Sequence, residues 1–146
     1  MRDLDQQKAL SIICHASVLF SAAIVSLLVP ISILVASENP IVKANARESI
    51  NFHLSLFIYA IATFTVGFFG LSLFIPFVMD DSLVTLHLPS GILRFLFPLS
   101  LVIMAGAWLI LVLLWLASLL LPIVAIVRVS KRPEVPFRYP FIFRFV

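Results

Sequence analysis

The sequence predicts an all-α integral membrane protein, folded as a helical bundle in a single domain. Three stretches contain no Asp, Glu, Lys or Arg: Ala9 to Ser37, Ser49 to Met79 and Phe95 to Val127. Each exceeds the roughly 20 apolar residues that carry a helix across the hydrocarbon core. Composition agrees, because 62% of the 146 residues are hydrophobic and 12% are charged. We therefore expect one transmembrane domain over 1–146, with three long hydrophobic segments at about 9–37, 49–79 and 95–127 and an interfacial tail at 128–146.

The first stretch has an awkward length for a simple crossing. Its 29 residues would reach about 44 Å as one helix, which is too long for one upright span and too short for two. It is also about twice as long as the apolar region of a secretory signal. Pro30 is the only strong helix breaker in it. Two interpretations stay open: a single crossing, or a hairpin that adds a fourth pass.

The basic residues predict the orientation. Five of the ten follow the last stretch, and cytoplasmic segments collect Lys and Arg. The C-terminus is therefore expected in the cytoplasm, and the loop from Asp80 to Arg94 outside. A hairpin in the first stretch would place nine of the ten basic residues in the cytoplasm instead of seven, so the charge rule favours the hairpin. The net charge of +3 indicates orientation and attraction to anionic lipid, not nucleic acid.

A polar stripe opens the second stretch. Its members are spaced by three or four residues and so share one helix face: Glu48, Asn51, Ser55, Tyr59 and Ala62. The first stretch carries a comparable stripe: Ser11, His15, Ala22 and Ser26. We expect the two stripes to meet, with His15 or the serines bonding toward Asn51 and Glu48, since unpaired polar groups in hydrocarbon are costly. The alternative is functional, because an intramembrane His near a carboxylate can mark a proton or substrate path.

No catalytic, metal or cofactor site is expected. Cys14 is the only cysteine, which excludes an internal disulfide, and no phosphate loop, Cys-x-x-Cys pair or zinc motif occurs. One Cys, three His and scattered serines do not assemble a nucleophile with its base. His15 could ligate haem or chlorophyll, although a hydrogen-bonded, helix-packing histidine is the more common use.

The loop and the tail both show alternating patterns. Val84, Leu86 and Leu88 predict a short extended piece resting on the membrane surface. In the tail, every second residue is aromatic: Phe137, Tyr139, Phe141, Phe143 and Phe145. Arg138 and Arg144 fall on the opposite face of such an extended segment. We expect the tail to act as a clasp over the helix ends, with its arginines facing headgroup phosphates or Glu48.

Several segments resemble a known family when taken together in order. They are Cys14-His15-Ala16-Ser17, Glu38-Asn39-Pro40-Ile41-Val42, the run from Arg47 to Ser55, and the ending that contains Arg138-Tyr139-Pro140. They are similar to a family of small bacterial membrane proteins of unknown function, related to the Tic-type twenty-kilodalton subunit of the chloroplast inner-envelope translocon. The resemblance implies three or four helices, both termini in the cytoplasm, no catalytic residues, and residence in the bacterial inner membrane or a related internal membrane.

The expected function is that of a non-enzymatic membrane protein, a translocon-like or assembly subunit. Its partners would be the lipid bilayer and other membrane proteins, with a homo-oligomer compatible and no nucleic acid. The alternative is a cofactor-binding or small-solute transport protein that uses His15 with Glu48 and Asn51, and an enzyme comes third. The candidate interaction residues are His15, Glu48, Asn51, Ser55, Tyr59, Arg138, Tyr139, Pro140 and Arg144.

Overall fold

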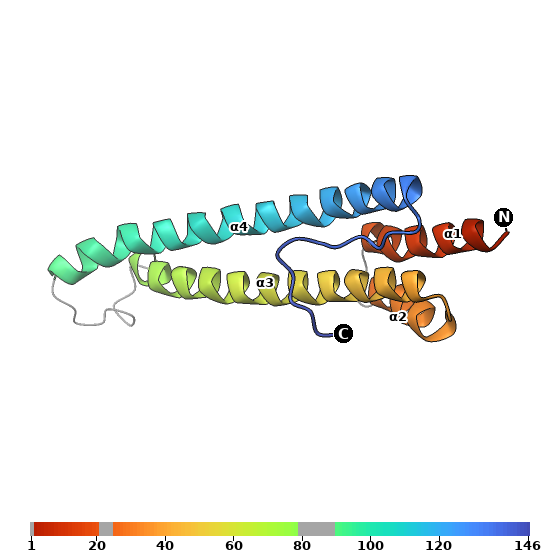
Figure 1. Cartoon of the computed structure of the whole chain (residues 1–146). Helices are drawn as coiled ribbons and strands as arrows, with labels where there is room; N and C mark the ends of the chain where they lie inside the picture. Colours follow the sequence, from red (N-terminus) through yellow and green to blue (C-terminus); the bar gives the residue numbers. More distant parts are fainter. Residues whose placement is uncertain (1, 21–24, 79–89) are drawn as a thin grey trace. The chain divides into compact units, whose positions relative to one another are not determined.

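The computed structural model describes residues 2–20, 25–78 and 90–146. Within them the regular structure is helical, which confirms the all-α class: α1 (Arg2–Ala16), the 3-10 turn η1 (Ser17–Phe20), α2 (Val25–Ala36), α3 (Pro40–Val78) and α4 (Ser90–Lys131) (Figure 1). The extended piece expected around Leu86 lies outside the described residues. The chain divides into unit 1, Met1–Ile58 with Trp115–Val146, and unit 2, Tyr59–Leu114.

Among the described residues two helices, not the expected three segments, are long and apolar enough to cross a membrane. They are Pro40–Ile75 and Phe95–Lys131. The first begins well before the uncharged stretch at Ser49, because Asn39 caps it: its Oδ1 accepts the backbone N–H groups of Ile41 at 2.9 Å and Val42 at 3.3 Å. Proline at the first helical position suits the same start. The charged residues of this region therefore lie inside α3.

The first stretch is broken into two short helices, so the expectation of a third long segment was wrong for the described residues. The break itself agrees with the hairpin interpretation. The 12 residues of α2 reach only about 18 Å, too short to cross. The helix does not break at Pro30, which lies inside α2. Helix α1 ends at Ala16, and the Ser17 hydroxyl donates to the Cys14 carbonyl at 2.8 Å, a local side-chain bond that competes with continued helix.

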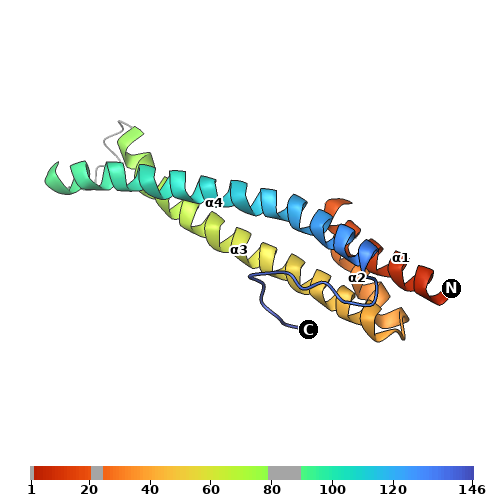
Figure 2. The same ribbon diagram turned by 45° about the horizontal axis from the view of Figure 1, so that its top comes forward.

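The core of unit 1 joins segments far apart in sequence. Its buried members come from η1, α3, α4 and the tail: Val18, Phe52, Ala125, Val129, Phe137 and Tyr139. The rings of Phe52 and Tyr139 stack at 4.1 Å between centroids. The tail, dark blue in Figure 2, passes along α3. It is therefore part of the core of this unit.

Unit 2 holds the second half of α3 beside the first half of α4. A Cβ added to Gly67 would lie 3.2 Å from the Ala107 Cβ, and one added to Gly70 would lie 2.8 Å from the Ile103 Cγ2. Small residues at these positions allow the two helices to approach closely. The outward faces are apolar, with Phe64, Phe68, Val102 and Trp108 exposed. This is the pattern of helices surrounded by lipid.

Candidate functional site

The candidate site is the face of α3 that binds the tail, within unit 1. Four polar side chains follow one another at intervals of three, three and four residues: Asn45, Glu48, Asn51 and Ser55. All four are buried, and each accepts a hydrogen bond from a backbone N–H of the tail. We call these four residues the docking stripe.

The first half of the tail is held by the first two members of the stripe. The Phe137 N–H donates to the Asn45 Oδ1 at 2.9 Å, and the Tyr139 N–H donates to the Glu48 Oε2 at 3.2 Å. These alternate residues also bury their rings against the unit 1 core. Backbone polar groups near a membrane need hydrogen-bond partners. Here the side chains on one face of α3 accept the hydrogen bonds that a neighbouring strand would accept in a sheet.

The tail turns at Phe141. This residue has φ 55°, in the left-handed region that bulky residues rarely adopt, and its side chain is 92% exposed. The expected single face of five aromatics is therefore wrong beyond Tyr139. The alternation needs a continuously extended backbone, and the turn after Pro140 interrupts it.

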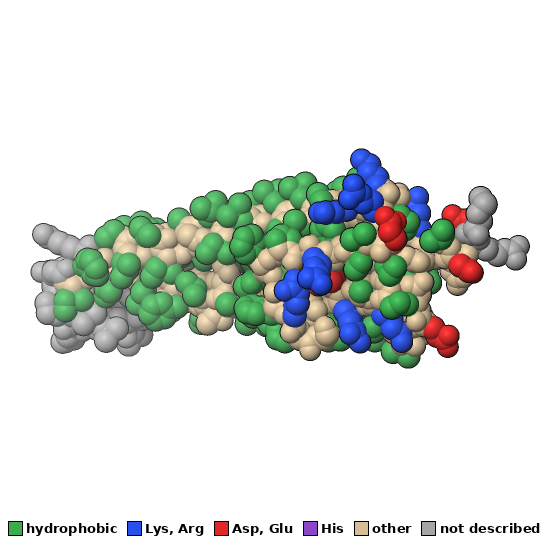
Figure 3. Space-filling model, in the orientation of Figure 1, with side chains coloured by type: hydrophobic (Ala, Val, Ile, Leu, Met, Phe, Trp, Pro, Cys, Tyr) green, Lys and Arg blue, Asp and Glu red, His purple; other side chains and the backbone are tan. Residues whose placement is uncertain are grey.

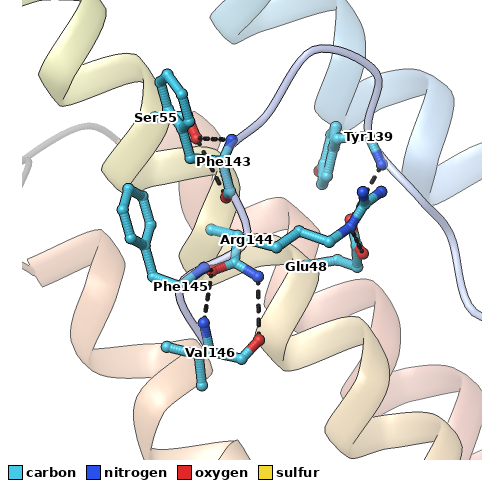
Figure 4. Close-up of polar contacts among 8 residues, drawn as sticks. Glu48, Ser55, Tyr139, Phe143, Arg144, Phe145 and Val146 are labelled. Carbon is cyan, nitrogen blue, oxygen red and sulfur yellow. Dashed lines mark hydrogen bonds and ion pairs between the residues drawn. The ribbon is translucent and has the colours of Figure 1, made fainter.

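After the turn the chain folds back along the stripe (Figure 4). The Phe143 N–H donates to the Ser55 Oγ at 2.8 Å. The Asn51 Oδ1 then accepts the N–H groups of Phe145 and Val146 at 2.9 and 3.1 Å, and its Nδ2 donates to the Val146 carbonyl at 3.3 Å. The Asn51 side-chain amide therefore holds the end of the tail in two ways: it accepts from backbone N–H groups and it donates to a backbone carbonyl.

Asn45 also connects the tail to α1. Its Nδ2 donates to the Ile41 carbonyl at 3.1 Å and to the Ser11 Oγ at 3.2 Å. A carbonyl only accepts, so the amide orientation is fixed and the Oδ1 faces the His15 Nε2 at 3.2 Å. The His15 Nε2 must then carry the proton.

The other ring nitrogen of His15 completes a chain of hydrogen bonds. With the proton on Nε2, the Nδ1 accepts from the Tyr139 hydroxyl at 2.9 Å. Burial lowers the pKa of His15 to about 4 and raises the pKa of Tyr139, so both stay neutral near pH 7. Because both imidazole nitrogens are occupied, the geometry favours the structural interpretation of His15 over a haem or chlorophyll ligand.

The expected partners of His15 were wrong. It bonds Asn45 and Tyr139, not Asn51 or Glu48, whose polar atoms bond the tail instead. Asn45 was missed, although it precedes Glu48 by three residues and so extends the same spacing. Asn45 lies four residues before the uncharged stretch that begins at Ser49, in a segment that was not predicted to be helical.

A second missed contact involves Gln7. Its Nε2 donates to the Pro133 carbonyl at 2.7 Å, and its Oε1 accepts from the Asn39 Nδ2 at 3.1 Å. It thereby joins α1 to the cap of α3 and to the start of the tail. A lone glutamine in a charged segment gives no sequence signal for such a role.

The remaining candidates divide between the units. Arg144 Nε lies 3.4 Å from Glu48 Oε1, the ion pair that the sequence suggested. Arg138 is exposed on the tail, and Pro140 precedes the turn. Tyr59 belongs to unit 2, where its carbonyl accepts the Thr63 hydroxyl at 2.7 Å. The structure therefore brings most of the candidates to the docking stripe, but not Tyr59.

The side chains of the site bind the tail and form no metal-binding cluster among the described residues. Among the described residues no group of three or more His, Cys, Asp or Glu side chains could hold a metal ion. Burial raises the pKa of the Cys14 thiol to about 12, so it stays protonated. The site can position the tail and present charge.

The described residues of unit 1 form a cleft and a groove. A cleft of about 770 Å³ lies among α1, α2 and the start of α3, where Asp3, Gln7 and Ser32 are among its lining residues. A groove of about 320 Å³ lies between the start of α3 and the tail, and carries Lys43, Arg47, Arg138 and Arg144. We call the second of these the basic groove. In Figure 3 the Lys and Arg side chains gather over these same elements and the end of α4.

Comparison with known proteins identifies the family. The model of the magnetosome magnetite crystal formation protein family, MamF/MmsF, matches residues 6–146. No curated protein and no solved structure matches the chain. The family match overturns the resemblance to the Tic-type translocon subunit, which rested on short motifs. The chain belongs to the MamF/MmsF magnetosome magnetite crystal formation protein family.

Proposed function

We propose that the chain is a non-enzymatic protein of the magnetosome membrane that takes part in magnetite crystal formation. The family match over nearly the whole chain carries this proposal. Two apolar helices of sufficient length support the membrane location. The docking stripe supports a binding or scaffolding role, because its side chains hold the tail and form no catalytic arrangement among the described residues.

The orientation of the protein determines which part faces the crystal. We infer that the tail and the start of α3 lie on the cytoplasmic side. The bond between Phe137 and Asn45 supports this, since it requires both segments to be on one side of the membrane. Five basic residues follow the last stretch and add the charge argument. The connection from Asp80 to Arg94 would then face the magnetosome interior.

In this proposal the apolar faces of the spanning helices contact lipid and other membrane proteins. Phe64, Phe68 and Trp108 are exposed on unit 2, and large aromatic side chains offer substantial contact area to a neighbouring helix. The protein would thus act by position and contact at the membrane where the crystal grows. A second copy of the chain is one such neighbour.

Genetic replacement tests the function. In a magnetite-forming bacterium that lacks the gene, the full chain should restore the crystal size distribution measured by electron microscopy. A chain that ends after Pro136 should restore it poorly, because the docking stripe then loses its partner. The Phe141→Asn variant, altered at an exposed position, is the matched control and should restore it. Unchanged crystals in the deletion strain would refute a role in crystal formation.

Reporter fusions test the orientation. A reporter active only outside the cytoplasm should be silent when fused after Val146 and active when inserted in the loop after Asp81. Strong activity at Val146 would overturn the assignment. A cysteine at Arg2, in a Cys14→Ser background, should resist labelling from the outer face, because Gln7 of α1 bonds Asn39 at the start of α3 and α1 would therefore lie on the same side as that start.

A further inference from the structure

The basic groove gathers charge from two distant segments of unit 1. Lys43 and Arg47 lie on the first turns of α3, and Arg138 and Arg144 lie on the tail, about a hundred positions later. The groove has a volume of about 320 Å³. Its cations come together only because the tail docks on α3.

These charges are poorly compensated from within the protein. Among the described residues the only ion pair is that of Arg144 with Glu48, and the same carboxylate also accepts the Tyr139 N–H. Lys43, Arg47 and Arg138 have no carboxylate partner in that part of the chain. Like charges held together repel, and an anion seated among them relieves the repulsion.

The place of the groove in the fold matches the membrane surface. Arg47 lies two residues before Ser49, where the uncharged stretch of α3 begins. The groove therefore sits where a spanning helix passes from hydrocarbon to water, which is the level of lipid phosphates. Basic clusters beside a transmembrane helix attract anionic headgroups.

The groove is also held in shape. Asn51, one of its lining residues, fixes the end of the tail through three hydrogen bonds. The Arg144 Nε donates to the Glu48 Oε1 at 3.4 Å, and Figure 4 draws this contact. The arginine is thereby anchored on one edge of its guanidinium group, and 57% of its side chain stays exposed. The geometry is that of a prepared site, not of a flexible basic tail.

We propose that the basic groove binds the phosphate group of an anionic lipid headgroup at the membrane surface. Arg47 and Arg138 would supply forked guanidinium contacts to phosphate oxygens, and Lys43 a point charge. Binding would brace the tail against α3 and couple its docking to the lipid composition of the membrane. A lipid ligand goes beyond the proposed function, which assigns no ligand to the basic groove.

Lipid binding by the purified full-length protein tests the proposal. In detergent micelles, phosphatidylglycerol should bind at least about tenfold more tightly than phosphatidylcholine, measured by thermal shift and native mass spectrometry. This follows from about fivefold per basic residue near an anionic surface. The triple variant Lys43→Gln, Arg47→Gln, Arg138→Gln should lose the preference. The matched control, Arg128→Gln, Lys131→Gln, Arg132→Gln, removes equal charge outside the groove and should keep it.

Inorganic phosphate distinguishes the source of the ligand. If it fails to displace phosphatidylglycerol at millimolar concentration, the ligand is the lipid, as proposed. Displacement at low millimolar concentration would show that the groove reads phosphate alone and overturn the lipid assignment. Equal loss in both triple variants would reduce the effect to general surface charge and overturn the site.

One further variant guards against misfolding. If the groove triple variant does not fold, Arg138→Gln alone, at an exposed position, should weaken phosphatidylglycerol binding about fivefold. An unchanged affinity in that variant would overturn the proposal. The binding assay uses no crystal readout, so its failure is distinguishable from failure of the proposed function.

Discussion

The two units hold their segments against α3 by different means. Unit 1 uses hydrogen bonds: Asn45, Glu48, Asn51 and Ser55 are buried and bond the backbone of the tail. Unit 2 uses close approach, with Gly67 and Gly70 against α4. Between helices in lipid, apolar burial supplies little attraction, so contact depends on tight packing or on polar bonds. The contact through polar bonds lies in unit 1, which carries most of the charged residues and lies near water.

The difference extends to what each unit exposes. Apart from Asp80, Asp81 and Arg94, every Asp, Glu, Lys and Arg of the chain belongs to unit 1. Unit 2 shows exposed Phe64, Phe68 and Trp108. We therefore expect unit 1 to respond to tail removal, pH and polar substitution, and unit 2 to respond to side-chain volume at its helix contact.

Removing the tail should produce the largest effect. A chain ending after Pro136 loses the buried rings of Phe137 and Tyr139, each worth about 1.5 to 3 kcal/mol. The free energy of unfolding in detergent should fall by about 3 to 6 kcal/mol, seen as a large drop in melting temperature. Phe141→Asn is the control and should change it little, because that side chain is exposed and asparagine tolerates positive φ.

Limited proteolysis checks the same contrast without mutation. Trypsin cleavage after Arg138 in inverted vesicles should be slow, because the flanking backbone N–H groups of Phe137 and Tyr139 are bonded to the docking stripe. Cleavage at the rate of an unfolded peptide would mean that the tail is free.

The second largest effect should be the dependence of folding stability on pH. The pKa of His15 is lowered from 6.5 to about 4 in the folded protein, so below pH 6.5 the unfolded chain binds a proton that the folded chain does not. Stability therefore falls as the pH drops from 6.5 toward 4, by an amount on the order of 2 kcal/mol. The difference in melting temperature between the wild type and His15→Gln should shrink over that interval. A constant difference would contradict the neutral, buried histidine.

Unit 2 should respond to a single methyl group. An added Cβ at Gly70 would meet the branched Ile103 side chain at 2.8 Å, so Gly70→Ala should cost about 1 to 2 kcal/mol after its gain in helix propensity. Gly106→Ala is the matched control, since nothing lies within 4 Å of its added Cβ. That variant should melt at the same temperature or higher. Equal destabilisation by both would remove the case for a tight contact at Gly70.

The smallest effect is expected at the end of the tail. Asn51→Leu removes three hydrogen bonds to Phe145 and Val146, whereas Phe57→Leu alters an exposed side chain. Polar bonds in membrane proteins average about 0.6 kcal/mol, and two of the three bonds share the Asn51 Oδ1. Counted as one donor and one acceptor contact, the loss in Asn51→Leu should cost about 1 kcal/mol and lower the melting temperature more than Phe57→Leu. Equal melting shifts would argue against a buried stripe.

Part of the candidate site was predictable from the sequence. The spacing of Glu48, Asn51 and Ser55 indicates a buried polar face, because a helix repeats every three or four residues. The spacing could not name the partner of that face. Both the first stretch and the tail carry polar or aromatic patterns that could pack on this face. Neither pattern indicates how the chain runs between helices, so the sequence does not show which of the two segments lies against the stripe.

The sequence by itself determined the helical membrane class and the two stretches that lie in the spanning helices, since hydropathy is a local property of the chain. It offered Glu48 only as one of two possible partners for Arg144. The tertiary structure decided the rest. It broke the first stretch near Ser17 and not at Pro30, reversed the tail at Phe141, and paired His15 with Asn45 and Tyr139. Each of these features depends on which polar groups bond to one another. Several groups could bond the same donor or acceptor, and the choice among them is made only when distant segments of the chain come into contact.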